Sequence, residues 1–223
     1  MTITDLPALE IPGHVPSVDG TPDHPMRIVT RQAAGLDAGG WDADTRARVT
    51  ALFDGLAADW HTRTSPQRTA VVADALDRGL GPDRRAGLCV EVGSGIGSYS
   101  ELLASRFVAV LAVDLALEML RLAPAAPGRR VKADASQLPV VDDGAVAVVL
   151  INAFLFPAEV DRVLAPNGVV VWVNSSGEST PIHLTAAEVA EVLPGEWDGV
   201  AARAGVGTWC VLHRKSEPVG AGS

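Results

Sequence analysis

The feature that most constrains the fold of this 223-residue chain is a run of three glycines at every second position, Gly93–Gly97. The apolar residues Leu88–Val90 and the acidic Glu91 lead into this run, and a helix-compatible segment, 99–106, follows it. Strand, glycine loop and helix in this order are typical of α/β sheets that open a ligand crevice. Glycine is needed because a side chain would block the tight turn or the approach of a ligand to backbone amides. The pattern predicts an α/β fold with a ligand site; the alternative is a plain structural turn.

The spacing of the glycines distinguishes two kinds of ligand loop. A dinucleotide fingerprint has the form G-x-G-x-x-G, in which the third glycine meets the pyrophosphate at the helix N-terminus. Here the third glycine, Gly97, comes one residue early, and Ser98 stands at the expected place. The pattern G-x-G-x-G after Glu91 instead resembles motif I of the class I S-adenosylmethionine-dependent methyltransferases. An NAD-dependent oxidoreductase remains an alternative that this spacing disfavours.

Acidic residues follow the next two predicted strands. The apolar run Phe107–Val113 ends in Asp114, about 20 residues beyond the glycines, where a carboxylate can accept both ribose hydroxyls of an adenosine. In the resembled family, an acidic residue at the third strand end contacts the adenine amino group, and Asp134 with the backbone of Ala135 matches that place. Each aspartate alone could be a strand-end cap or a solvated charge. Their register with the glycine loop favours a cofactor site.

The later strands fit the same resemblance. Ala145–Ile151 is an unbroken apolar run that predicts a buried strand, and Asn152 follows it. The segment Arg162–Gly168 is similar to the R-V-L-x-P-G-G turn before the fifth strand of small-molecule methyltransferases, with Asn167 in place of the first glycine. Because asparagine tolerates positive φ, we expect the turn to survive this change.

The resemblance covers residues 86–214 and implies a doubly wound, mostly parallel sheet of about seven strands with a C-terminal antiparallel hairpin and an N-terminal helical extension. It also implies S-adenosyl-L-methionine as the cofactor. The residues that match the cofactor positions of the family are Glu91, Gly93, Ser94, Gly95, Gly97, Asp114, Leu115, Asp134, Ala135 and Asn152.

The flanking segments differ from this domain in composition. Residues 1–40 are rich in Pro, Gly and Asp and predict an irregular arm, with partial order over 22–40. Residues 215–223 predict a flexible tail. The intervening residues 41–85 predict two helices.

The first of these two helices is expected from Asp42 or Asp44 to about Arg63, since apolar residues recur there at spacings of three and four. The second begins at Ser65-Pro66, an N-cap followed by proline at the first helical position, and ends at Gly79 or Gly81. The first helix is loosely similar to the F-x-x-x-A-x-x-W start of quinone-biosynthesis methyltransferases. Residues 41–85 are therefore a candidate substrate cap, although their aromatic residues could equally anchor the helix to the domain.

Charge and hydropathy exclude several classes of protein. The formal net charge is −9, from 27 acidic and 18 basic residues, which opposes a broad nucleic-acid interface. The sequence contains no run of 18 or more apolar residues, so it predicts no membrane span. The N-terminal residues lack the pattern of a secretory signal. Cys89 and Cys210 lie in the first and last predicted strands of the domain, so they predict two buried free thiols in a reducing cytoplasm. The scattered histidines predict no metal site.

The catalytic residues are not fixed by the sequence, and His61, His183 and Tyr99 are the candidates. We expect a cytoplasmic methyltransferase that acts on the O, N or C nucleophile of a small molecule, without nucleic-acid or membrane partners. The alternative is a non-catalytic S-adenosylmethionine-binding regulator or partner protein that retains the fold. The accepting atom and the oligomeric state stay open, and a homodimer is compatible with the sequence.

Overall fold

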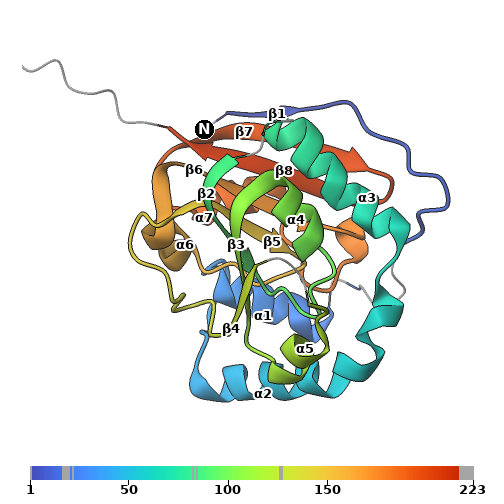
Figure 1. Ribbon diagram of the computed structural model, residues 1–223, viewed down its shortest axis with the longest axis vertical. Coiled ribbons are helices and arrows are strands. Elements are labelled where there is room, and N and C mark those ends of the chain that lie inside the picture. The colour runs from blue at the N-terminus through green and yellow to red at the C-terminus, as the bar shows by residue number, and fades with distance from the viewer. Residues whose placement is uncertain are drawn as a thin grey trace, which may run out of the picture.

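The computed structural model describes residues 2–16, 21, 23–81, 83, 85–125 and 128–215. Its centre is one sheet of eight strands in the order β1-β7-β8-β6-β5-β2-β3-β4, with helices on both faces (Figure 1). The strands are β1 (Thr2–Asp5), β2 (Arg85–Val92), β3 (Phe107–Asp114), β4 (Arg129–Lys132), β5 (Ala145–Ile151), β6 (Leu164–Asn174), β7 (Trp197–Ala204) and β8 (Gly207–Arg214). Only β8 runs against its neighbours, so the sheet is parallel apart from this strand.

The helices alternate with the strands along most of the chain. The α-helices are α1 (Pro25–Ala33), α2 (Ala43–Leu56), α3 (Pro66–Asp74), α4 (Ser100–Arg106), α5 (Leu117–Leu122), α6 (Pro157–Val163) and α7 (Ala186–Val192). Two short 3₁₀ helices, η1 (Ala57–Arg63) and η3 (Gly177–Ser179), and a π-helical turn, η2 (Ala75–Leu80), complete the set. Local sequence explains several of their ends. The hydroxyl of Ser65 accepts the N–H of Arg68 at the start of α3, and Gly81, with φ of 85°, ends η2.

Each face of the sheet carries its own hydrophobic core because side chains alternate along the strands. On β5, Val148 and Leu150 belong to the core beneath α6 and α7, whereas Ala147 and Val149 belong to the core beneath α3 and α4. Both faces of this strand are therefore buried, which accounts for its unbroken apolar sequence. The predicted α/β class, with a mostly parallel sheet and an antiparallel C-terminal hairpin, is confirmed.

The N-terminal arm differs from the sequence-based expectation. Within the segment expected to be irregular, β1 pairs in parallel with β7 and adds an eighth strand to the seven expected. Beyond β1, the N–H groups of Leu6 and Leu9 still bond to carbonyls of β7. A four-residue strand is too short to show periodicity, and it forms here because it satisfies the open edge of β7. Further along the arm, α1 is capped by Nδ1 of His24, which accepts the N–H of Met26.

Two other expectations change in detail. The single helix expected to reach Arg63 consists of α2 followed by the tighter η1. The tail predicted for 215–223 lies outside the described residues apart from Lys215, whose N–H bonds to the carbonyl of Glu196. Cys89 and Cys210 are buried and free, in strands separated by β5 and β6, as expected.

Candidate active site

The glycine loop connects β2 to α4 in a backbone conformation that side chains disfavour. The φ angles of Gly93, Gly95 and Gly97 are 67°, 55° and 74°. A Cβ atom on Gly93 would also lie 2.8 Å from the Cβ of Ala153, and one on Gly95 would lie 3.5 Å from Nε1 of Trp60. The positive φ angles thus favour glycine at all three positions, and at Gly93 the close approach of Ala153 also excludes a side chain.

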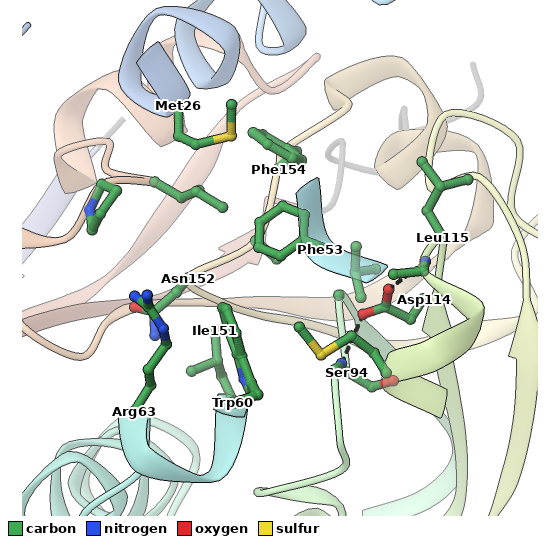
Figure 2. Close-up of a pocket in the computed structure, with 18 of the residues that line it drawn as sticks. Met26, Phe53, Trp60, Arg63, Ser94, Asp114, Leu115, Ile151, Asn152 and Phe154 are labelled. Carbon is green, nitrogen blue, oxygen red and sulfur yellow. Dashed lines mark hydrogen bonds between the residues drawn. The ribbon is translucent and has the colours of Figure 1, made fainter. Parts of the chain in front are cut away.

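Two carboxylates fix this loop from opposite sides. At the end of β3, Asp114 accepts the N–H groups of Gly95 and Ala116 at 2.7 and 2.8 Å (Figure 2). Beneath the loop, Glu91 is only 2% exposed and accepts the hydroxyl of Ser100 at 2.6 Å. Burial raises the pKa of Asp114 and raises that of Glu91 to about 7. Both residues line the cavity described below.

The carboxylate of Asp134, expected to contact adenine, bonds to protein groups that the sequence did not predict. Its carboxylate accepts Nε1 of Trp41 at 3.0 Å, the N–H of Ser136 at 2.9 Å and the guanidinium of Arg46 at 3.1 Å. Partial burial acts to raise the pKa of Asp134, but these hydrogen bonds outweigh it and leave the pKa below its usual value. The neighbouring Ala135 lines the cavity, as does Trp41. Asp134 therefore positions Trp41, and its contact with adenine stays a prediction.

A cavity of about 900 Å³ opens at the carboxyl ends of β2, β3, β5 and β6. Helices α1 and α2 and the 3₁₀ helix η1 cover it. Its lining includes Tyr99 and a group of Trp and Phe rings: Trp41, Phe53, Trp60, Phe154 and Phe156. These rings contact one another: Trp41 lies 5.4 Å from Phe154, and Phe53 lies 5.6 Å from Trp60, between ring centroids. Figure 2 shows Met26 of α1 and Phe154 on one side of the cavity, with Trp60 and Arg63 rising from η1 on the other.

The end of this cavity near β5 and β6 is polar. Asn152 has φ of 51° and bonds twice to Ser175, from Nδ2 to Oγ and from the N–H of Ser175 to Oδ1, both at 2.8 Å. The turn with positive φ expected at Asn167 is not found, because β6 continues through Asn167 as a strand. Ser94 and Ser176, 7% and 4% exposed, also line the cavity, and neither hydroxyl has a hydrogen-bond partner among the described residues.

Of the three candidate catalytic residues, the structure brings only Tyr99 to the cavity. Burial raises the pKa of Tyr99, an effect that the charge of Arg68 and a hydrogen bond with Ser175 partly offset. Tyr99 therefore stays protonated at neutral pH and can donate a hydrogen bond. His61 is exposed, with Nδ1 beside the carbonyl of Ala58. His183 is buried and lines a separate pocket of about 470 Å³, where burial lowers its pKa.

The sequence analysis missed several polar or charged cavity residues, among them His24, Arg63 and Arg68. His24 is the N-cap of α1 and is followed by a proline, so the cap-proline pattern could have identified the helix start. The arginines carry no comparable signal, because arginine on a helix is usually solvated. Among the residues that the structure describes, no group of three or more metal-ligating side chains occurs. In the same part of the chain, no helix is long and apolar enough to cross a membrane.

The sheet order, the glycine loop and the acidic residue that follows β3 define a Rossmann-like α/β protein with a cofactor crevice at its switch point. Residues 90–172 match the family model described as a methyltransferase domain. Residues 90–172 therefore form a methyltransferase domain, with the fold of the class I, S-adenosylmethionine-dependent type. The predictions of this class and of S-adenosyl-L-methionine as its cofactor are confirmed.

Two of the solved structures that match the chain show the same fold over most of its length. One is a Methanococcus maripaludis protein that is provisionally assigned as an S-adenosyl-L-methionine-dependent methyltransferase. It is 16% identical to this chain with a TM-score of 0.54, and the match covers 82% of this chain and 98% of the Methanococcus chain. The protein DhpI, solved with SAH (S-adenosylhomocysteine), is 18% identical with a TM-score of 0.58, covering 75% and 96%. A chain from the Haloferax volcanii complex of the Trm112 methyltransferase activator is 21% identical with a TM-score of 0.47, and the match spans 54% of this chain and 59% of that one. No curated protein sequence matches the chain.

Proposed function

We propose that this protein transfers the methyl group of S-adenosylmethionine to a small-molecule acceptor. The observation that carries the proposal is the cavity of about 900 Å³ at the glycine loop, covered by α1, α2 and η1. Binding sites for small molecules have about this size, up to roughly 1,000 Å³. A covered cavity suits an acceptor that enters whole, and the net charge of −9 argues against a nucleic acid.

The residues present fit the cofactor. Gly93 and Gly95 line the cavity without a side chain between the loop backbone and a ligand, and the unpartnered hydroxyl of Ser94 beside them is available to a ligand. Asp114, which ends β3, would hold the ribose, with Leu115 and Ala135 against the adenine. When bound, S-adenosylmethionine supplies an activated methyl group on its sulfonium.

The protein's own contribution to the reaction is alignment and the exclusion of water. The rings of the cap, Phe53 and Trp60, shield the glycine loop from solvent. At the polar end, Tyr99 and Asn152 can orient the nucleophile of the acceptor by hydrogen bonds. The two buried free thiols also favour a cytoplasmic enzyme.

Calorimetric titration with S-adenosylhomocysteine tests the proposal at Asp114. Replacing a carboxylate that bonds to the ligand removes charge-assisted hydrogen bonds, so we expect Asp114→Asn to bind about tenfold or more weakly. Asp5→Asn, a matched change at an exposed position on β1, should bind like the wild type. Equal affinities for the wild type and Asp114→Asn would contradict the proposed cofactor site.

Mass-spectrometric detection of methylated products tests the enzymatic step. A panel of small phenols, amines and carboxylic acids with S-adenosylmethionine should give at least one product. Cofactor binding without any product would favour the alternative, a non-catalytic S-adenosylmethionine-binding protein.

A further inference from the structure

The strand order determines which end of the cavity faces the methyl acceptor, and the inference drawn from it rests on the function proposed above. The glycine loop follows β2, and the predicted ribose ligand Asp114 ends β3 on one side of it. β5 and β6 lie on the other side of β2. With the adenosine held at β3, the reacting end of the donor extends towards β5 and β6. The polar end of the cavity is therefore the acceptor side.

A buried hydroxyl at this end is available to a ligand. Ser176 is 4% exposed, its N–H bonds to Oγ1 of Thr180, and its carbonyl accepts the N–H and the hydroxyl of Ser179. Its own hydroxyl has no partner among the described residues although it lines the cavity. Leaving a hydroxyl desolvated and unbonded is unfavourable, so a bound group that accepts its hydrogen bond would remove this cost.

Two arginines, Arg63 of η1 and Arg68 of α3, also line the cavity. Arg63 is exposed at the cavity mouth and stacks on Trp60, with its guanidinium 5.5 Å from the ring centroid (Figure 2). Arg68 is half-buried and donates a hydrogen bond to the carbonyl of Arg63. Its charge also acts on the pKa of Tyr99, which lines the cavity together with Ser175, the neighbour of Ser176. We refer to Arg63, Arg68, Tyr99, Ser175 and Ser176, all of which line the cavity, as the polar wall.

Among the residues that the structure describes, the charged side chains of this wall are the two arginines. Among the described residues that line the cavity, the carboxylates are Glu91 and Asp114. Glu91 is buried beneath the glycine loop, and Asp114 is at the end of β3, on the adenosine side. The acceptor side therefore presents two guanidinium groups and hydroxyl donors, a combination that recognises carboxylates and phosphates.

We propose that the methyl acceptor carries an anionic group, a carboxylate or a phosphate, that binds between Arg63, Arg68 and the hydroxyl of Ser176. The apolar part of the acceptor packs against the aromatic lining, which includes Phe53 and Phe154. The acceptor is thus a small organic acid or phosphate ester with an apolar body.

Binding of three simple aromatic probes to the protein saturated with S-adenosylhomocysteine tests this proposal. Benzoate and phenyl phosphate carry the anion, and benzamide is neutral with nearly the same shape. We expect at least one anion to bind about tenfold more tightly than benzamide, and the better anion identifies the group. Arg63→Gln and Arg68→Gln should each reduce this preference, whereas Arg203→Gln, the same change at an exposed position on β7, should keep it.

Ser176→Ala provides a second measurement. If the hydroxyl serves a ligand, its removal lowers affinity for the preferred anion and leaves the melting temperature of the free protein unchanged or higher. A lower melting temperature with unchanged anion affinity would show a structural role and contradict the proposal.

Other outcomes separate this proposal from the proposed function. Failure of the wild type to bind S-adenosylhomocysteine would contradict the proposed function itself. Normal binding of S-adenosylhomocysteine with equal affinities for benzoate, phenyl phosphate and benzamide would overturn only the anionic acceptor. The arginines could instead hold the donor's own carboxylate, which 5′-methylthioadenosine lacks. In that case, Arg63→Gln and Arg68→Gln would weaken the binding of S-adenosylhomocysteine and leave the binding of 5′-methylthioadenosine unchanged. If they do so without altering the preference among the three probes, the proposal is also overturned.

Discussion

Glu91 and Asp114 are two cavity carboxylates whose surroundings give them different properties. Asp114 is half-buried, and backbone N–H groups stabilise its charged form. Glu91 is buried beneath the glycine loop with the hydroxyl of Ser100 as its hydrogen-bond donor, and its pKa is about 7. Asp114 is thus suited to bind hydroxyl groups as a carboxylate, whereas Glu91 changes charge near neutral pH.

The raised pKa of Glu91 predicts a pH-dependent stability. Its folded-state pKa of about 7 exceeds the ordinary 4.5, so the folded protein binds the extra proton between these values. The stability contribution of this group therefore falls as the pH rises from 4.5 to 7. Glu91→Gln has no titrating carboxyl group, so it removes this loss of stability, and its amide oxygen still accepts the hydroxyl of Ser100. We expect the free energy of unfolding of the variant to equal that of the wild type at about pH 4.5 and to exceed it by roughly 1–3 kcal/mol at about pH 8.

Urea denaturation of the cofactor-free protein across this pH range measures the effect. Glu10→Gln, a change at an exposed glutamate, should differ little from the wild type at any pH. A stability difference between Glu91→Gln and the wild type that does not grow with pH would show that Glu91 is already charged in the folded protein.

The elements that cover the cavity, α1, α2 and η1, are held to the domain at several points. In α1, the guanidinium of Arg27 donates hydrogen bonds to the carbonyls of Glu178 and Thr180, in the segment after β6. In α2, the carboxylate of Asp54 accepts the N–H of Glu118 at the start of α5. In η1, Trp60 lies against Gly95 and Phe53. The cover is therefore a fixed part of the domain and forms a wall of the cavity.

Trp60→Ala tests the role of η1. Loss of the indole removes the contact with Gly95 and the stacking platform of Arg63, so we expect S-adenosylhomocysteine to bind about tenfold more weakly. Trp60→Phe should retain most of the affinity, and Leu122→Ala, at an exposed residue of α5, should leave it unchanged. Calorimetry measures these affinities. Unchanged binding by Trp60→Ala would show that η1 does not cover the cofactor.

At the scale of the whole molecule, the eight-stranded sheet separates stability from ligand binding. β1 lies at the edge beside β7, and four strands separate it from β2 and its glycine loop (Figure 1). Ile3 packs against the core beneath α6 and α7, whereas Thr4 points to the other side and is exposed. The edge strand thus contributes to the core without touching the site.

Ile3→Asp should therefore lower stability and spare binding. We expect a loss of roughly 1–3 kcal/mol in the free energy of unfolding, because a charge replaces a partly buried apolar side chain. Affinity for S-adenosylhomocysteine should be unchanged in the folded protein. Thr4→Asp, on the opposite face of the same strand, should cost less than about 0.5 kcal/mol. Equal stabilities of the two variants in chemical denaturation would show that β1 does not pack on the core.

Features set by neighbouring residues were predictable from the sequence. The glycine loop, the N-cap at Ser65 and the buried strands follow from short-range preferences for backbone conformation and from unbroken apolar runs. The position of Asp114 after its strand follows in the same way, since strand, loop and helix occur in a fixed order.

The tertiary structure alone decided which distant residues meet. β1 forms because β7 offers an open edge, and Asp134 binds Trp41 and Arg46, which are distant from it in the chain. The polar wall of the acceptor side combines the cap with the segment after β6. These contacts depend on how distant segments pack together, and the periodicity of a single sequence does not predict them. The sequence thus determined the fold class and the methyl donor, and the tertiary structure supplied the basis for inferring an anionic acceptor.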